Sequence, residues 1–262
     1  MITSTSNSRV KWVRTLQTKK SQREAESLFV IEGPRLLQEA QAAQAFVRSI
    51  FHLEQLDQDE HSLINALVVS GATRETVSEH VLKAMSATDT PQDMLAVVAW
   101  PEAAIPVVLD LALILDRIAD PGNLGTILRT ARACGVGAVL LLEGTVDPYN
   151  PKVVRAAAGA HFHLPLIESS LQDLDEVIPG LPIWIADAHQ GEQYDCIDWS
   201  KPAALVIGSE AHGHRPELDR LAAGHVRIPM QDESESLNAG IASAVILFEI
   251  IRQRGERCRS AQ

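Results

Sequence analysis

The stretch Val107–Leu142, VVLDLALILDRIADPGNLGTILRTARACGVGAVLLL, carries the pattern that decides the fold of this chain. Its first part, Val107–Leu115, is apolar but for one aspartate and predicts a buried strand. After a Pro-Gly-Asn turn, the spacing predicts a helix over Leu124–Cys134 and a second apolar strand over Val136–Leu142. Strands that are apolar throughout and alternate with helices are typical of an α/β protein with a mostly parallel sheet.

The same pattern continues toward the C-terminus. Short apolar runs at Ile183–Ala186 and Ala203–Ile207 predict two more buried strands. The segment Ser236–Arg254 is predicted to form a long amphipathic helix. Residues 107–262 are therefore expected to form one α/β domain.

The first hundred residues differ, because their predicted elements are short and mixed. Apolar runs of strand length occur at Leu28–Ile31 and Leu67–Val69. Two prolines bracket residues 101–106, which predicts a linker. The chain is thus expected to contain a smaller α/β domain over residues 1–100 and a larger one over residues 107–262.

The composition is that of an ordinary globular protein. Of 262 residues, 46% are hydrophobic and 22% are charged. No apolar run approaches the roughly 20 residues of a membrane span, and the polar N-terminus does not resemble a signal peptide, so no membrane partner is expected. The three cysteines have no paired spacing, which favours a reducing, cytoplasmic location over a disulfide framework or a zinc site.

A net charge of −11 argues at first against a nucleic-acid partner, but the charges are unevenly distributed. Residues 1–23 hold six basic side chains and no acidic one, and four arginines cluster near the C-terminus. These side chains are Arg9, Lys11, Arg14, Lys19, Lys20 and Arg23, followed by Arg252, Arg254, Arg257 and Arg259. Either both termini are simply solvated, or they form local surfaces that contact phosphate.

The first motif is Asp120–Arg129, DPGNLGTILR, at a junction between a predicted strand and a predicted helix. A helix N-terminus presents free backbone N–H groups and suits an anion. Asn123 is either a helix cap or a functional side chain. Arg129 lies six residues later, on the predicted helix.

The second motif is Ile207–Gly213, IGSEAHG, which follows a predicted strand. Gly208 would allow a ligand or another backbone to approach closely. Glu210 lies beyond the carboxyl end of the strand, where α/β proteins place ligand contacts, although a simple polar loop is the alternative. Two histidines, His212 and His214, without further ligands do not predict a metal site.

The third motif is Ile228–Asn238, IPMQDESESLN, an apolar strand end that leads through an acidic loop into the last predicted helix. Ser236 is either the cap of that helix or part of a loop that binds a cofactor. Ile228, Met230 and Leu237 could supply an apolar slot for an adenine ring.

Taken together, in this order and spacing, the three motifs resemble those of the SpoU (TrmH-like) branch of the SPOUT RNA methyltransferases. The resemblance covers nearly the whole chain, since segments such as Phe29–Arg35, FVIEGPR, resemble that family's N-terminal substrate-binding domain. It implies a C-terminal domain with a deep trefoil knot, a homodimer, and an N-terminal RNA-binding domain like a ribosomal protein. It also implies S-adenosylmethionine as cofactor and methyl transfer to a ribose 2′-hydroxyl of RNA.

The resemblance also implies roles for individual residues. The positions that match the family's functional polar residues are Asn123, Arg129, Glu210, Ser236 and Asn238. The positions expected to contact the cofactor are Gly208, Ile228 and Leu237, which match the family's, together with Met230 from the apolar slot. The equivalent of Arg129 is assigned to activation of the hydroxyl, yet an arginine is a poor base and could instead position a phosphate.

Alternative functions remain open at this point. A separate N-terminal domain favours structured large-subunit rRNA as substrate, and tRNA is the alternative. A non-catalytic RNA-binding or ribosome-assembly protein could use the same fold. A dinucleotide-dependent oxidoreductase is disfavoured, because no G-x-G-x-x-G fingerprint follows the first strand of the larger domain.

Overall fold

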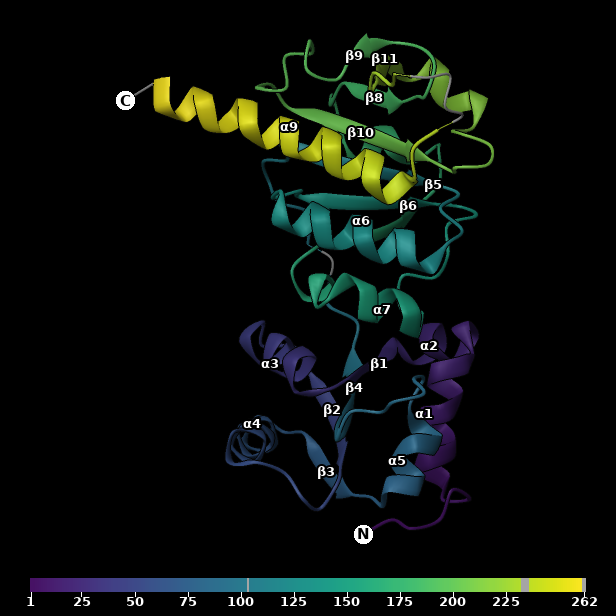
Figure 1. The fold of residues 1–262 in the computed structure, drawn as a ribbon, viewed down its shortest axis with the longest axis vertical. Helices are drawn as coiled ribbons and strands as arrows, with labels where there is room; N and C mark the ends of the chain where they lie inside the picture. Colours follow the sequence, from purple (N-terminus) through teal and green to yellow (C-terminus); the bar gives the residue numbers. More distant parts are fainter. Residues whose placement is uncertain (103, 232–235, 261–262) are drawn as a thin grey trace. The chain divides into compact units, whose positions relative to one another are not determined.

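The computed structural model describes residues 1–102, 104–231 and 236–260 (Figure 1). The chain divides into two compact units. The first unit contains Met1–Glu102 and Tyr149–His163, and the second contains Ala103–Pro148 and Leu164–Gln262. Within the described part of the chain, no helix is both long and apolar enough to cross a membrane.

The first unit is built on a four-stranded sheet with helices on both faces. Its strands, in spatial order, are β1 (Leu28–Glu32), β4 (Met94–Ala99), β2 (Val47–His52) and β3 (Thr73–Thr76). Strand β4 runs antiparallel to β1 and β2, whereas β2 and β3 are parallel. The N-terminal helices are α1 (Ser8–Thr18), α2 (Lys20–Glu26), α3 (Pro34–Ala42), α4 (Gln58–Val69) and α5 (Glu79–Met85).

Successive side chains of each strand pack alternately into two hydrophobic cores, one on each face of this sheet. Phe29 and Ile31 of β1 lie in a cluster with buried side chains of α3 and α4. Leu28 and Val30 lie in the other cluster, with buried side chains of α1 and α5. Because a strand alternates its side chains between two faces and both faces of this sheet are covered, the first four residues of β1, Leu28–Ile31, are all apolar.

The predicted strand Leu67–Val69 is wrong, because these residues form the last turn of α4. Asp57 and Glu60 form a capping box that begins this helix. Leu63 and Leu67 are both buried, four residues apart on one helical face. A cap together with a helical apolar face outweighs the strand preference of a short valine pair.

One segment of the first unit comes from within the sequence of the second. Tyr149 begins this segment, which includes α7 (Pro151–Ala157) and the 3₁₀ turn η1 (Ala160–Phe162). The ring of Tyr149 stacks on Trp100 at 4.3 Å and packs against Phe29 at 5.1 Å. Aromatic packing therefore joins residues 149–163 to the first unit, although the sequence places them in the domain predicted over residues 107–262.

The second unit contains a seven-stranded sheet in which all paired strands are parallel. Its strands, in spatial order, are β7 (Leu166–Ser169), β6 (Ala138–Leu142), β5 (Leu111–Asp116), β10 (Ala203–Gly208), β8 (Ile183–Ala186), β11 (Ala222–Arg227) and β9 (Glu192–Gln193). The remaining elements are α6 (Pro121–Ala133), α8 (Leu174–Val177), the 3₁₀ turn η2 (Pro216–Arg220) and α9 (Ala239–Ser260). Helices α6 and α9 lie side by side (Figure 1).

Two element boundaries in this unit differ from those predicted. Strand β5 begins at Leu111, where its pairing with β10 begins, and Val107 and Val108 are exposed. The apolar run predicts one strand from Val107, but Val107 and Val108 pair with no strand in the part of the chain that the structure describes. Helix α6 begins at Pro121 rather than Leu124, because Asp120 caps it and the Pro-Gly-Asn turn forms its first turn.

Candidate active site

The first turn of α6 leaves the side chain of Asn123 available for other contacts. Asp120 is the N-cap, and its Oδ1 accepts from the backbone N–H of Asn123 at 2.8 Å. Of the two interpretations of Asn123, the helix-cap one is therefore wrong, since Asp120 takes that position. Proline at the first helical position costs no hydrogen bond there.

The three motifs meet at the carboxylate of Glu210. Its Oε1 accepts from Asn123 Nδ2, from Asn238 Nδ2 at 3.1 Å and from the backbone N–H of Ala239 at 3.1 Å. Asn238 Nδ2 also donates to Asn123 Oδ1 at 2.8 Å. A carboxylate that accepts several N–H groups holds both amides in fixed orientations, because charge-assisted hydrogen bonds are the stronger kind.

Asn238 also begins helix α9. Its Oδ1 accepts from the backbone N–H of Ile241 at 3.2 Å, and its own carbonyl accepts from the N–H of Ala242 at 2.9 Å. These are the bonds of a capping residue. Asn238 rather than Ser236 therefore caps the helix, and the helix starts at Ala239 instead of Ser236.

A cavity of about 470 Å³ lies beside this cluster. It is at the carboxyl ends of β8, β10 and β11, the edge at which open α/β sheets bind ligands. All four residues predicted to contact a cofactor line it, and so do two of the predicted polar residues. These six are Gly208, Ile228, Met230, Leu237, Glu210 and Ser236. The volume falls in the range of small-molecule and cofactor sites.

Gly208 is required by close packing of the loop that follows β10. A Cβ atom at this position would lie 2.5 Å from the backbone carbon of Gly213 and 2.5 Å from the backbone nitrogen of His214. The loop folds back because Ser209 and Gly213 exchange backbone hydrogen bonds of 3.0 and 2.7 Å. Glycine therefore lets the loop that carries Glu210 close against the end of its own strand.

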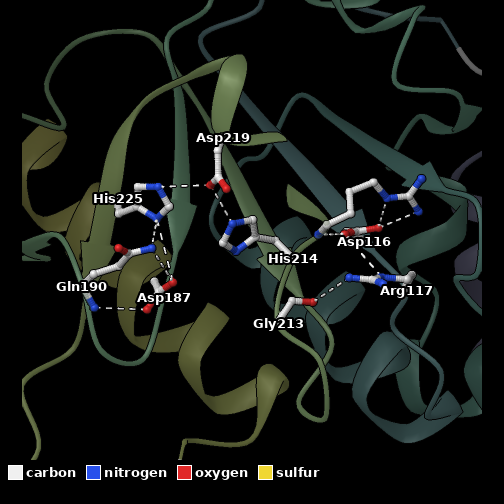
Figure 2. A network of polar contacts seen from close by, with 9 residues as sticks. Asp116, Arg117, Asp187, Gln190, Gly213, His214, Asp219 and His225 are labelled. Atoms are coloured by element: carbon white, nitrogen blue, oxygen red, sulfur yellow. Dashed lines mark hydrogen bonds and ion pairs between the residues drawn. The ribbon is translucent and has the colours of Figure 1, made fainter. Parts of the chain in front are cut away.

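Asp116 anchors the same loop and was not identified from the sequence. Its side chain is fully buried at the carboxyl end of β5. Its Oδ2 accepts from the backbone N–H of Arg215 at 2.7 Å, and its Oδ1 accepts from Arg215 Nε at 2.8 Å (Figure 2). A lone aspartate that ends an apolar strand was the signal that could have revealed it, because a buried carboxylate needs a partner.

Asp187, at the end of β8, is a second carboxylate that the sequence did not reveal. It lines the cavity, as does His189. Burial alone would raise the pKa of Asp187, but N–H groups of His189 and Gln190 outweigh that effect and lower it. The cavity wall therefore carries an ionised carboxylate at neutral pH, which favours a positively charged ligand.

The structure does not bring Arg129 into this cluster. The side chain is exposed on α6 and does not line the cavity. Six helical residues separate it from Asn123, which is about 9 Å along the axis and about 120° around it. It has no hydrogen bond or ion pair with any residue that the structure describes.

Several basic side chains at the termini serve the fold and are not available to contact phosphate. Arg23 is buried and donates to the carbonyl of Leu16. Arg254 donates to the carbonyls of Trp199 and Asp110, and its burial lowers its pKa. The side chains of Arg257 and Arg259 lie outside the described residues.

A phosphate-binding surface is better supported on α1. Lys11 and Arg14 on this helix and Lys19 just after it are exposed and make no ion pair within the described part of the chain, whereas Arg9 pairs with Glu75. The predicted basic surface is thus reduced to a few side chains along one helix.

Comparison with known proteins gives two family matches. Residues 110–248 match the SpoU rRNA Methylase family, and residues 7–96 match the MRM3-like substrate binding domain.

Individual relatives match over most of the chain. This chain is 34% identical to the 23S rRNA (guanosine(2553)-2′-O)-methyltransferase RlmP of Bacillus subtilis, over 95% of this chain and 98% of that protein. It is 29% identical to the mitochondrial rRNA methyltransferase 3 of Mus musculus, over 94% of this chain and 72% of that one. The AdoMet-bound rRNA methyltransferase from Sinorhizobium meliloti has a similar structure, with a TM-score of 0.87, 29% identity and coverage of 96% and 97%.

Proposed function

Since the chain belongs to the SpoU rRNA methylase family, we propose that it transfers a methyl group from S-adenosylmethionine to a ribose 2′-hydroxyl of 23S rRNA. The observation that carries the proposal is the cavity at the carboxyl ends of β8, β10 and β11. All four predicted cofactor-contacting residues line that cavity, beside a hydrogen-bonded cluster built from all three motifs.

The residues of the cavity suit S-adenosylmethionine. Ile228, Met230 and Leu237 line it with apolar surface, which excludes water from an adenine ring. The ionised Asp187 stabilises a positively charged sulfonium. When bound, the cofactor supplies an electrophilic methyl carbon.

The polar cluster has a positioning role in this proposal. Glu210 holds the amides of Asn123 and Asn238, so the wall of the site that faces the incoming ribose is rigid. Ser236 lines the same cavity and offers a hydroxyl. Fixed orientation of the reacting groups can supply several kcal/mol of the barrier.

We further propose that the protein acts as a homodimer. Helix α9 exposes three large apolar side chains, Ile241, Phe248 and Ile251, whose spacings of seven and three place them on one face. A second copy that covers this face would also meet α6, which packs against α9. Arg129 on the exposed surface of α6 would then serve the cavity of the other copy, as an activator of the hydroxyl or as a phosphate ligand.

We assign RNA binding to the first unit, with the predicted domain of residues 1–100 as its main part. The match of residues 7–96 to a substrate binding domain supports this role, as do the exposed basic side chains of α1. The knot that the family resemblance implies depends on a chain path that includes residues 232–235, which lie outside the described residues, so the knot stays a prediction. A cytoplasmic location is also part of this proposal, and the unpaired spacing of the three cysteines supports it.

Methyl transfer from labelled S-adenosylmethionine to separated rRNA and tRNA tests the function directly. The expected result is label in a 2′-O-methylnucleoside after digestion of the rRNA fraction. Label in tRNA alone would reject the rRNA substrate and retain the chemistry. No label and no binding of the cofactor by titration would reject the enzyme and favour the non-catalytic RNA-binding alternative.

A further inference from the structure

Two histidines and an aspartate from separate elements converge at the rim of the cavity. His214 lies in the loop after β10, Asp219 in η2 and His225 in β11. The carboxylate of Asp219 lies between the two imidazoles (Figure 2). Its Oδ1 is 2.8 Å from His214 Nε2 and 3.3 Å from His225 Nε2. One ligand atom from each of the three lies within 4.8 Å of the others.

His225 has a carboxylate near each of its ring nitrogens. Nε2 faces Asp219, and Nδ1 is 3.9 Å from Asp187 Oδ2. A neutral imidazole has one N–H and can donate to only one of these acceptors. Without a metal ion, Nε2–H can face Asp219 while Nδ1 accepts from Gln190 Nε2 at 3.4 Å. With a metal ion, Nε2 would be the ligand and Nδ1–H would turn toward Asp187.

The spacing of the three side chains is compatible with a metal ion. A tetrahedral zinc ion with bonds of about 2.0–2.2 Å places neighbouring ligand atoms about 3.3–3.5 Å apart. The separation of 3.3 Å between His225 Nε2 and Asp219 Oδ1 matches, and the 2.8 Å between His214 Nε2 and Asp219 Oδ1 would lengthen by about 0.5 Å when the metal replaces this hydrogen bond. We propose that His214, Asp219 and His225 bind a divalent transition-metal ion of the zinc class, with water as the fourth ligand.

The surroundings of the three ligands are those of a built metal site. A histidine that binds a metal usually donates its other N–H to a carboxylate, and Asp187, 3.9 Å from His225 Nδ1, could take that role after a small rotation of the ring. Gln190 Nε2 donates to Asp187 Oδ2 at 3.2 Å and so holds this carboxylate in place. The side chains of His214 and His225 are 11% and 21% exposed, whereas Asp219 is 46% exposed and leaves the fourth position open to solvent.

Rigid neighbours hold the ligands before a metal binds. His214 lies between Gly213, which is paired with Ser209, and Arg215, whose backbone is bound by the buried Asp116. His225 is part of a sheet strand. Ligands that the fold already orients lose little entropy on binding.

The expectation from the sequence was that no metal site exists, because His212 and His214 had no further ligand near them in the chain. The fold brings Asp219 and His225 to His214, which the spacing alone did not show. The role inferred here goes beyond methyl transfer. A metal ion would tie the loop that carries Glu210 to β11 and so stabilise the rim of the cavity, which both His214 and Asp187 line.

The proposal is tested with the full chain, free of any affinity tag and dialysed against a chelator. A calorimetric titration with zinc chloride alone is expected to show one zinc-binding site per chain. Cobalt(II) in place of zinc is expected to give the intense visible absorption of a four-coordinate ion. Zinc is also expected to raise the melting temperature, because it binds the folded chain.

Variants at the ligands identify the site. His225→Gln and Asp219→Asn are each expected to weaken zinc binding at least tenfold and to abolish the zinc-dependent rise in melting temperature. The matched control is His61→Gln, which removes an exposed histidine on α4 in the other unit and is expected to bind zinc like the original chain.

Two results would overturn the proposal. The first is an original chain that binds no zinc and gives a six-coordinate cobalt spectrum, which would leave the three side chains joined by their own hydrogen bonds and ion pairs. The second is full zinc binding by folded His225→Gln and Asp219→Asn chains. If either variant fails to fold, as judged by circular dichroism, His214→Gln together with the cobalt spectrum of the original chain decides whether these residues bind the metal.

Discussion

At the scale of single residues, the site depends on Glu210, whose one oxygen accepts from Asn123, Asn238 and the backbone of Ala239. Each donor belongs to a segment far from Glu210 in the sequence. The carboxylate therefore aligns the start of α6, the loop after β10 and the start of α9 at one point. The charge of Glu210 strengthens this alignment, because hydrogen bonds to a charged acceptor are about twice as strong as neutral ones.

Glu210→Gln tests this role with little change in shape. The glutamine can keep the acceptor oxygen in place, but it loses the charge and puts an N–H₂ group where the second carboxylate oxygen was. Methyl transfer is expected to fall about 10- to 100-fold, which corresponds to the roughly 1.5–3 kcal/mol of a charged hydrogen bond. The melting temperature should stay close to that of the original chain, and an unchanged turnover rate would contradict the assignment.

Asp116 is the residue whose loss should cost most in stability. Asp116→Asn leaves the guanidinium of Arg215 beside a neutral group in a buried position. The free energy of unfolding is expected to fall by about 3–5 kcal/mol, as when one partner of a buried ion pair is removed. Chemical denaturation measures the change.

Asp198→Asn provides the control, because that aspartate is exposed and pairs with the exposed Lys201. Its denaturation midpoint should match that of the original chain. Equal midpoints for the two variants would show that Asp116 does not anchor the loop.

At the scale of elements, α1 combines a buried face with a basic one. Val10, Val13 and Leu16 enter the core of the first unit. Lys11 and Arg14 lie on the exposed face, and Lys19 follows the last turn. The same helix can therefore pack into the core of the first unit with one face and contact RNA with the other.

Replacing Lys11, Arg14 and Lys19 by glutamine should weaken RNA binding without unfolding the unit. The slope of log K for RNA binding against log salt concentration is expected to become less negative by about 2–3, because three phosphate contacts are lost. Filter binding at several salt concentrations measures the slope. Cofactor affinity should not change, since these residues are far in sequence from every cavity-lining residue.

The matched control removes three exposed charges of the same unit that lie on three different elements. This variant carries Arg74→Gln, Lys83→Gln and Lys152→Gln. Its slope of log K for RNA binding against log salt concentration should stay close to that of the original chain. Similar losses in both triple variants would mean that total charge, rather than α1, governs binding.

The elements also show what could be predicted from the sequence. The strands β8 and β10 were predicted nearly residue for residue, because their apolar runs are fully paired within the sheet. The errors arose where a capping side chain decides the outcome. Asp57 converts the Leu67–Val69 run into helix, and Asp120 starts α6 three residues early. Such caps act on local backbone groups that an apolar pattern does not represent.

Within the site, the structure brings together three of the five polar residues that the motifs supplied, and their roles stay predictions. Asn123, Glu210 and Asn238 form one hydrogen-bonded cluster. Asp116 and Asp187 were missed, since only the packed sheet shows that β5 and β8 end beside the same loops. Arg129 was expected in the site but lies on an exposed helical surface of its own chain.

At the scale of the whole molecule, two features lack a role within one chain: the exposed Arg129 and the apolar face of α9. The homodimer proposed above would give a role to both. Such a contact between identical copies is isologous, so each copy would give its Arg129 and receive the other's.

Mixing two inactive variants tests this arrangement. Arg129→Ala and Glu210→Gln are each expected to show little methyl transfer alone. After co-refolding, mixed dimers would hold one intact site each, and about a quarter of the original activity should return if copies pair at random. No recovery, with mixed dimers demonstrated by mass spectrometry, would place Arg129 in the site of its own chain.

The segment Tyr149–His163 has a consequence for how this molecule is made. The ribosome releases the chain in order, yet the aromatic side of the first unit stays open until Tyr149 and Phe162 reach Phe29. Between Glu102 and His163, a further 61 residues must be translated, which takes roughly 3–12 s at 5–20 residues per second. During that interval the nascent chain exposes an incomplete core, so slow translation through these codons would prolong its need for a chaperone.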